Sequence, residues 1–92
     1  MTTANGVTTV EHEKGLHARP ASVLVRTASE FDADVRVATS DGDDADATSS
    51  VGVMSLGVGP GDRIEITAEG TDATRAVDRL VALVDDNFEI DE

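Results

Sequence analysis

The sequence of 92 residues lacks cysteine, tryptophan and tyrosine, and Phe31 and Phe88 are its only phenylalanines. Without cysteine, the chain has no disulfide, no thiolate nucleophile and no cysteine-based zinc site. It also lacks an apolar run near the ~20 residues of a membrane-spanning helix, and its polar N-terminus is unlike a signal peptide. We therefore expect a single domain, residues 1–92, that is cytoplasmic and has no membrane insertion.

Basic residues are scarce as well. Nineteen Asp and Glu residues outnumber seven Lys and Arg residues, among which Lys14 is the only lysine, and the net charge is −12. This charge repels nucleic acid and anionic membranes, so neither is an expected partner. An acidic surface that is poor in lysine fits a halophilic protein in a salt-rich cytoplasm.

The sequence offers no convincing metal site. The segment "DGDDAD", Asp41–Asp46, resembles a calcium-binding loop, but it lacks the glutamate at the spacing that supplies the bidentate ligand. His12 and His17 are the only histidines, and no cysteine assists them. We interpret the acidic segment as a solvated turn and expect no metal and no cofactor.

Hydropathy patterns predict the element order β-α-β-β-α-β-α. β-branched residues and period-two alternation indicate strands, and apolar residues at helical spacing indicate helices. Alternating strands need one buried face, which the amphipathic helices must cover. The pattern therefore predicts an α+β two-layer sandwich, with a four-stranded antiparallel or mixed sheet and its helices on one side. The expected elements are a strand at Val7–Val10, a helix at Ala18–Phe31, strands at Asp32–Thr39 and Asp44–Ala47, a helix from Ser49 to Gly57, a strand at Asp62–Glu69 and a helix from Thr71 towards Phe88.

Residues that favour helix ends support these boundaries. Pro20 suits the first turn of a helix, where its missing N–H has no partner. Ser49 is predicted to cap the second helix, Gly57 to end it in the left-handed conformation, and Thr71 to cap the third. The tail, residues 89–92, is expected to fray.

The heptapeptide "GLHARPA", Gly15–Ala21, places His17 at the start of the first helix. Unsatisfied backbone N–H groups and the helix dipole favour an anion there. The same positive end disfavours the imidazolium form, which leaves a nucleophilic ring nitrogen. A phosphoryl group on that nitrogen would meet the backbone donors and the fixed charge of Arg19, whose planar fork matches phosphate oxygens.

The residues by themselves leave other roles for His17 open. A histidine before a helix is often a capping or surface residue. Serine-hydrolase chemistry is poorly supported because the G-x-S-x-G motif is absent. The residue types therefore permit phosphoryl chemistry without requiring it.

Longer motifs narrow these alternatives. "GLHARPA" followed by "VLVRTASEFDADV", and then "SSVGVMSLGVGPGD", resembles HPr, the histidine-containing phosphocarrier family of the phosphoenolpyruvate-dependent sugar phosphotransferase system. The resemblance extends from about Val7 to Phe88, with both motifs in the family's order. It implies the family's open-faced sandwich, with a mainly antiparallel sheet and three helices on one face.

The resemblance also implies a role for each residue of the first motif. Enzyme I, charged by phosphoenolpyruvate, would transfer a phosphoryl group to Nδ1 of His17, and a sugar-specific enzyme IIA would receive it. Arg19 and the backbone N–H groups of Ala18 and Arg19 would stabilise the phosphoryl group. Such a protein is turned over by other enzymes and is not itself an enzyme. Carriers of this kind are usually monomers.

The second motif carries a regulatory site and a docking surface in the family. Ser49 falls where many relatives have a serine that an ATP-dependent kinase phosphorylates, although plain helix capping is the competing interpretation. Its neighbours Thr48 and Ser50 depart from the family pattern, which puts regulation in doubt. The resemblance implies partner docking at Val51, Met54 and Arg26, and the first two could instead belong to the core.

Three other functions stay open at this stage. His17 could feed a dihydroxyacetone kinase relay instead of a sugar permease, which no residue here distinguishes. A regulatory binding module acting through phosphorylated Ser49 is a second alternative, although it would not need both His17 and Arg19. A ferredoxin-like small-molecule sensor shares the layering but would not require "HARPA".

Overall fold

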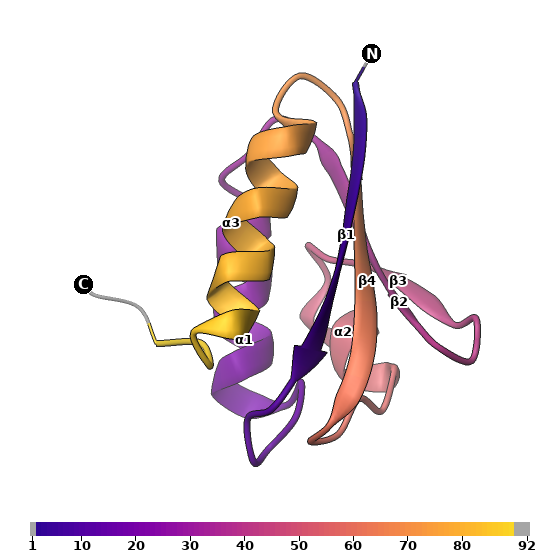
Figure 1. Cartoon of the computed structure of the whole chain (residues 1–92), viewed down its shortest axis with the longest axis vertical. Coiled ribbons are helices and arrows are strands. Elements are labelled where there is room, and N and C mark those ends of the chain that lie inside the picture. Colours follow the sequence, from indigo (N-terminus) through magenta and orange to yellow (C-terminus); the bar gives the residue numbers. More distant parts are fainter. Residues whose placement is uncertain (1, 90–92) are drawn as a thin grey trace.

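The structure is a computed structural model and describes residues 2–89 (Figure 1). Its elements follow the predicted order β-α-β-β-α-β-α. They are β1 (Thr3–Val10), α1 (Ala18–Ala28), β2 (Asp34–Thr39), β3 (Asp44–Asp46), α2 (Ser50–Ser55), β4 (Asp62–Glu69) and α3 (Ala73–Asp85).

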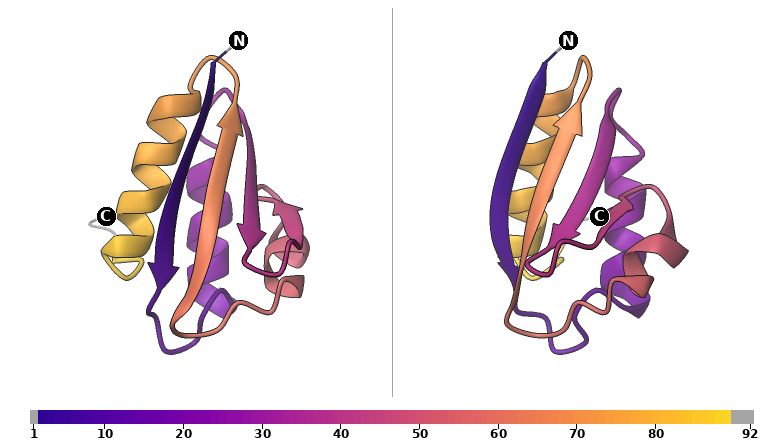
Figure 2. Two further views of the ribbon diagram at one scale, coloured as in Figure 1. Left: turned by 45° about the vertical axis from the view of Figure 1, so that its right-hand side comes forward. Right: turned by 90° about the vertical axis from the view of Figure 1, so that its right-hand side faces the viewer.

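The four strands form one sheet in the order β1-β4-β2-β3, and all three pairings are antiparallel. α1 and α3 lie against one side of this sheet, and its other side is open (Figures 1 and 2). The short helix α2 packs beside α1 and β3. The predicted sandwich is therefore confirmed, and the choice between an antiparallel and a mixed sheet is decided.

Alternation along the strands builds the core. Val35 and Val37 of β2 are buried, and so are Ile64 and Ile66 of β4, in agreement with the alternation that indicated these strands. The helices contribute leucine, valine and alanine side chains to the same cluster. Burial of this apolar surface holds the helical layer on the sheet.

The structure corrects two predicted helix ends. α1 ends at Ala28 and not at Phe31, and the Ser29 hydroxyl donates to the Val25 carbonyl at 2.8 Å in the turn that follows. α3 begins after Asp72, so Thr71 is not its cap. The Asp72 carboxylate instead accepts from the Asp32 N–H at 2.8 Å, because the start of α3 meets the segment leading into β2.

The chain turns sharply after α3. Asn87 and Phe88 both have left-handed backbones, with φ of 60° and 63°. This turn directs the Phe88 side chain into the core, where it is 5% exposed, so Phe88 is buried without being part of the helix. Of the tail that was expected to fray, residues 90–92 lie outside the described residues. No helix within residues 2–89 is both long and apolar enough to cross a membrane.

Candidate phosphoryl-acceptor site

His17 is the residue immediately before α1. Its backbone is extended, with φ of −131° and ψ of 163°, and its side chain is exposed and makes no capping hydrogen bond. The imidazole therefore does not occupy the N–H groups of the first turn of α1. An anion bound to His17 would find these donors, and the positive end of the helix dipole, beside it.

The backbone at Ala18 is strained. Its φ of 51° lies in the left-handed region, which residues with a side chain rarely adopt. Such a conformation costs on the order of 1–3 kcal/mol and is commonly found at functional sites. The sequence did not predict this strain, because nothing in the residue type alanine signals it.

The loop before His17 is anchored to the loop after α2. Leu16 is fully buried, and its N–H donates to the Val58 carbonyl at 3.0 Å. Gly15 has φ of 63°, and a Cβ there would lie 2.2 Å from the Val58 carbonyl oxygen. This close approach requires glycine. Sequence patterns do not indicate this requirement, because the contact joins Gly15 to a residue more than 40 positions away.

Arg19 and Pro20 follow in the first turn of α1. Pro20 lies in the first turn, as predicted, and is buried, whereas Arg19 is exposed. Both border a shallow depression of about 330 Å³ between the start of α1 and the turn after α3. The depression is lined by His12, Arg19, Pro20, Asn87, Phe88 and Glu89. The structure thus brings the chain's C-terminal turn next to the predicted phosphoryl site.

The start of α2 is built differently. Ser49 caps the helix as predicted, because its hydroxyl accepts from the Gly52 N–H at 3.1 Å. Just before it, the Asp46 carboxylate accepts from the Thr48 N–H at 2.8 Å and from the Thr48 hydroxyl at 2.7 Å. These two hydrogen bonds hold the pKa of Asp46 below its usual value. A second shallow depression beside Ser49 is lined in part by Asp43, Asp44 and Asp46.

The β2–β3 hairpin carries an exposed ion pair. The Arg36 guanidinium donates to the Asp44 carboxylate at 2.7 Å, and this hydrogen bond lowers the pKa of Asp44 and raises that of Arg36. Both side chains are about half exposed, so the pair adds little stability. Within residues 2–89, no cluster of three or more His, Asp or Glu side chains has the arrangement of a metal site.

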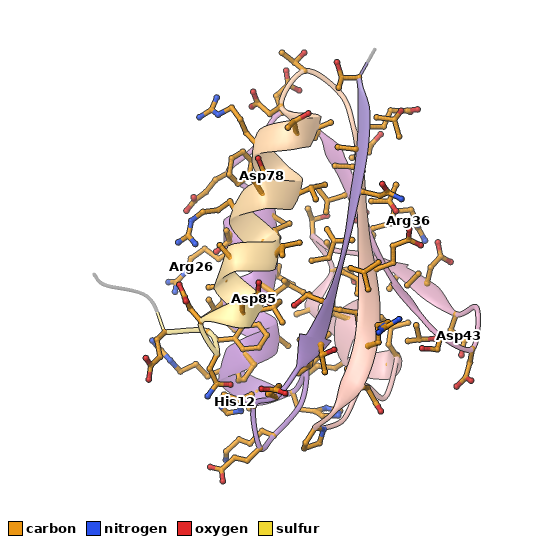
Figure 3. All side chains as sticks on the ribbon, viewed as in Figure 1. His12, Arg26, Arg36, Asp43, Asp78 and Asp85 are labelled. Carbon is orange, nitrogen blue, oxygen red and sulfur yellow. The ribbon has the colours of Figure 1, made fainter. Side chains whose placement is uncertain are left out.

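The predicted docking residues lie on the surface. Val51 is 71% exposed and Met54 is 37% exposed, whereas Val53 between them is fully buried. The alternative of a core role for Val51 and Met54 is therefore excluded. Arg26 is exposed in the last turn of α1 and extends from the helical layer away from the sheet (Figure 3).

An exposed histidine before an uncapped helix, on an open-faced α+β sandwich, leaves backbone N–H groups available to an anion at His17. Residues 5–86 match the family described as the PTS HPr component phosphorylation site. The chain belongs to this HPr family, which confirms the resemblance drawn from its motifs.

Known relatives agree with this assignment. The chain is 51% identical over 73 residues to the phosphocarrier protein HPr of Haloferax volcanii, covering 78% of this chain and 82% of the relative. It is 48% identical over 73 residues to the HPr of Vibrio cholerae, covering 79% and 85%. The crystal structure of HPr-C-His from Thermoanaerobacter tengcongensis matches with a TM-score of 0.89 and 35% identity, covering 97% of this chain and 99% of that one. The relative from Haloferax supports the halophilic interpretation of the acidic surface.

Proposed function

We propose that this protein carries a phosphoryl group on Nδ1 of His17 in the cytoplasm. It accepts the group from enzyme I, which phosphoenolpyruvate charges, and donates it to a histidine of a sugar-specific enzyme IIA. The main support is the geometry of His17, which is exposed and leaves the N–H groups of α1 without a side-chain cap. Membership of the phosphocarrier family agrees with it.

The transfer is an in-line exchange between two imidazoles. The Nδ1 lone pair of neutral His17 attacks the phosphorus of the donor phosphohistidine, while Nε2 carries the ring proton. The new P–N bond forms as the donor's P–N bond breaks, and the donor imidazole, which carries a proton on its other ring nitrogen, leaves as a neutral ring with the electron pair. Donation to enzyme IIA is the same exchange in the opposite direction, so no cofactor or net redox change is needed.

Arg19 and the first-turn backbone stabilise the transferred group in this proposal. The N–H groups of Ala18 and Arg19 belong to the first turn of α1 and have no partner within that turn. The Arg19 guanidinium supplies a permanent positive charge two residues from His17. Catalysis of phosphoryl transfer depends mainly on such positioning and electrostatics, which an enzyme and its carrier can share.

The exposed apolar residues of α2 fit a transient docking surface. Val51 and Met54 lie on the helix that packs beside α1, and Arg26 lies on α1 itself. Apolar residues with a charged rim are typical of short-lived protein interfaces. We infer that a monomer consisting of one domain, residues 1–92, presents this surface to enzyme I and then to enzyme IIA.

Two alternatives share parts of this site. A dihydroxyacetone kinase subunit could receive the phosphoryl group from His17 in place of enzyme IIA, with the same chemistry at the carrier. Regulation through phosphorylated Ser49 is less well supported, because the Ser49 hydroxyl already caps α2 and three aspartates line the depression beside it. A phosphate there would face like charges.

Phosphorus NMR tests the proposal. Purified protein is mixed with phosphoenolpyruvate and enzyme I from the same organism in concentrated KCl, with His17→Ala and Ser49→Ala samples alongside. We expect an acid-labile phosphoramidate signal in wild type and in Ser49→Ala, and none in His17→Ala. A signal that survives in His17→Ala, or no signal with an enzyme I that phosphorylates itself, would contradict the proposal.

A further inference from the structure

His12 organises the loop between β1 and α1. Its Nδ1 atom accepts the Lys14 N–H at 3.1 Å, and its backbone carbonyl accepts the Gly15 N–H at 2.8 Å. Because Nδ1 acts as an acceptor, the proton of the neutral ring lies on Nε2. One residue thus holds two consecutive N–H groups of the chain leading to His17.

The His12 ring is held in place by the core. It packs edge-on against the Phe88 ring, with the centroids 6.1 Å apart and the ring planes at 78°. Phe88 is itself buried by the left-handed turn after α3. Figure 3 shows His12 in the loop next to the C-terminal end of α3. The contact with Phe88 therefore fixes the orientation of the ring, and with it the position of Nδ1 relative to the loop.

The loop from His12 to His17 is anchored at both ends. His12 fixes the Lys14 and Gly15 N–H groups, and the Val58 carbonyl fixes the Leu16 N–H at 3.0 Å. His17 comes next, with no side-chain hydrogen bond to α1 of its own. The position of His17 is therefore set by the loop residues before it and by helix α1 after it.

Protonation of His12 would remove one of these anchors. In the imidazolium form Nδ1 carries a proton, so it opposes the Lys14 N–H instead of accepting it. Charged groups of both signs lie near His12, and carboxylates attract the imidazolium whereas the bases repel it. Arg19 of α1 and Glu89 after α3 line the same depression as His12, and Glu11, Glu13 and Lys14 are its neighbours in the loop.

We propose that His12 is a positioning residue for phosphoryl transfer at His17. Its neutral ring accepts the Lys14 N–H and holds the loop in the productive conformation, and its protonation releases the loop. This inference rests on the proposed phosphoryl-acceptor role of His17. It adds a pH-dependent control of phosphoryl transfer by a residue other than His17 and Arg19.

Two substitutions separate the acceptor atom from the ring. In His12→Asn, the amide oxygen can accept from the N–H two residues on, as asparagine does in Asx turns, but it does not titrate. In His12→Phe, the ring contact with Phe88 can persist, but the acceptor is lost. Asparagine is thus the conservative variant that restores the hydrogen bond, and phenylalanine is the matched variant that retains only the packing.

Potassium phosphoramidate serves as a phosphoryl donor that needs no partner protein. The His17 Nδ1–P bond forms as the donor's P–N bond breaks and ammonia leaves. Rates are followed by phosphorus NMR at about pH 8 and about pH 5, on either side of the usual histidine range. Any signal in a His17→Ala sample reports phosphorylation of His12 itself and is subtracted.

We expect His12→Phe to be about fivefold slower than wild type at the higher pH, as loss of one neutral hydrogen bond implies, and His12→Asn to stay close to wild type. Each rate is divided by the rate of His12→Asn at the same pH. At the lower pH, this relative rate of wild type should fall towards that of His12→Phe. Dividing by the His12→Asn rate removes every pH effect that the three proteins have in common.

Amide hydrogen exchange of the unphosphorylated protein provides a readout independent of transfer. Protection of the Lys14 amide, corrected for intrinsic exchange, should fall in acid in wild type and stay constant in His12→Asn. A wild-type rate that keeps a constant ratio to His12→Asn at both pH values, or a His12→Phe rate equal to wild type, would overturn the role of His12 and leave the carrier function intact. Absence of any phosphoryl signal on His17 in wild type would overturn both.

Discussion

The first turns of α1 and α2 expose the same kind of backbone N–H groups, yet they are completed in opposite ways. At α2 the Ser49 hydroxyl accepts from the Gly52 N–H at 3.1 Å, so the residue before the helix supplies a partner for one of its free N–H groups. At α1 the His17 side chain makes no such bond, and Ala18 adopts a strained left-handed backbone. The start of α2 is capped by its own serine, whereas the start of α1 has no side-chain cap, and the proposed function assigns its open N–H groups to a phosphoryl group.

The surrounding charges sharpen this contrast. Arg19 lies in the first turn of α1, whereas Asp43, Asp44 and Asp46 border the depression at Ser49. An incoming phosphate would be attracted at the first position and repelled at the second. A helix N-terminus therefore becomes an anion site only where the capping side chain leaves the donors free and the neighbouring charges permit it.

The largest expected effect is a loss of stability on substitution of Gly15, in the loop that leads into α1. Gly15→Ala would combine left-handed strain with a clash against the Val58 carbonyl, at 2.2 Å from the new Cβ. We expect a loss of about 3 kcal/mol or more in the free energy of unfolding, measured by urea denaturation in concentrated KCl.

Gly57→Ala is the matched control for that substitution. Gly57 also has a left-handed backbone, with φ of 68°, but a Cβ there would meet open space. Strain alone should cost about 1–2 kcal/mol. Equal losses for the two variants would show that the contact between the loop before His17 and the loop after α2 is unimportant.

A smaller effect, confined to transfer, is expected for Arg19→Ala. Loss of one charged donor to the phosphoryl group should slow phosphorylation of His17 by about a hundredfold. Stability should change little, since Arg19 is exposed. The rate is measured by phosphorus NMR under the conditions used for His17→Ala.

Arg75→Ala provides the control for net charge. Arg75 lies in α3, where its guanidinium is 3.4 Å from the Asp72 carboxylate, away from the start of α1. The substitution Arg75→Ala removes the same charge as Arg19→Ala, and it should leave the rate of His17 phosphorylation unchanged. An equal slowing in both variants would mean that Arg19 acts only through the overall charge of the protein.

The smallest effect tests the self-capped helix. Ser49→Ala should lower the free energy of unfolding by about 1 kcal/mol, because the Gly52 N–H loses its acceptor. Transfer to His17 should not change. If Ser49→Ala slowed transfer without loss of stability in the same denaturation assay, the serine would belong to the functional surface and the comparison of the two helix starts would fail.

Much of the fold could be predicted because its signals are local. The alternation at Ile64 and Ile66, the capping hydroxyl of Ser49 and the glycine at Gly57 each act within a few residues. One of the two corrected helix ends lies where a distant segment competes for the helix start. Asp72 replaced Thr71 as the residue before α3 because its carboxylate meets the Asp32 N–H, a partner 40 residues away.

The residues of the candidate site also differ in whether local sequence signals could predict them. The sequence pointed to His17 and Arg19 through a motif of consecutive residues, and their placement at the start of α1 follows from Pro20 and the apolar spacing behind it. His12 was considered only as a metal ligand and set aside. Its contact with Phe88 joins residues that are 76 positions apart, so no sequence pattern could indicate it.

The sequence by itself determined the order of elements and the amphipathic faces, because periodicity and helix-end chemistry act over one or two turns. His17 and Arg19 were singled out by the resemblance of their motif to the HPr family. Only the tertiary structure decided the left-handed backbone at Ala18, the anchoring of Leu16 by Val58 and the depression that joins Arg19 to the turn after α3. Those features depend on packing between segments far apart in the chain. Their geometry is fixed when the helical layer closes on the sheet.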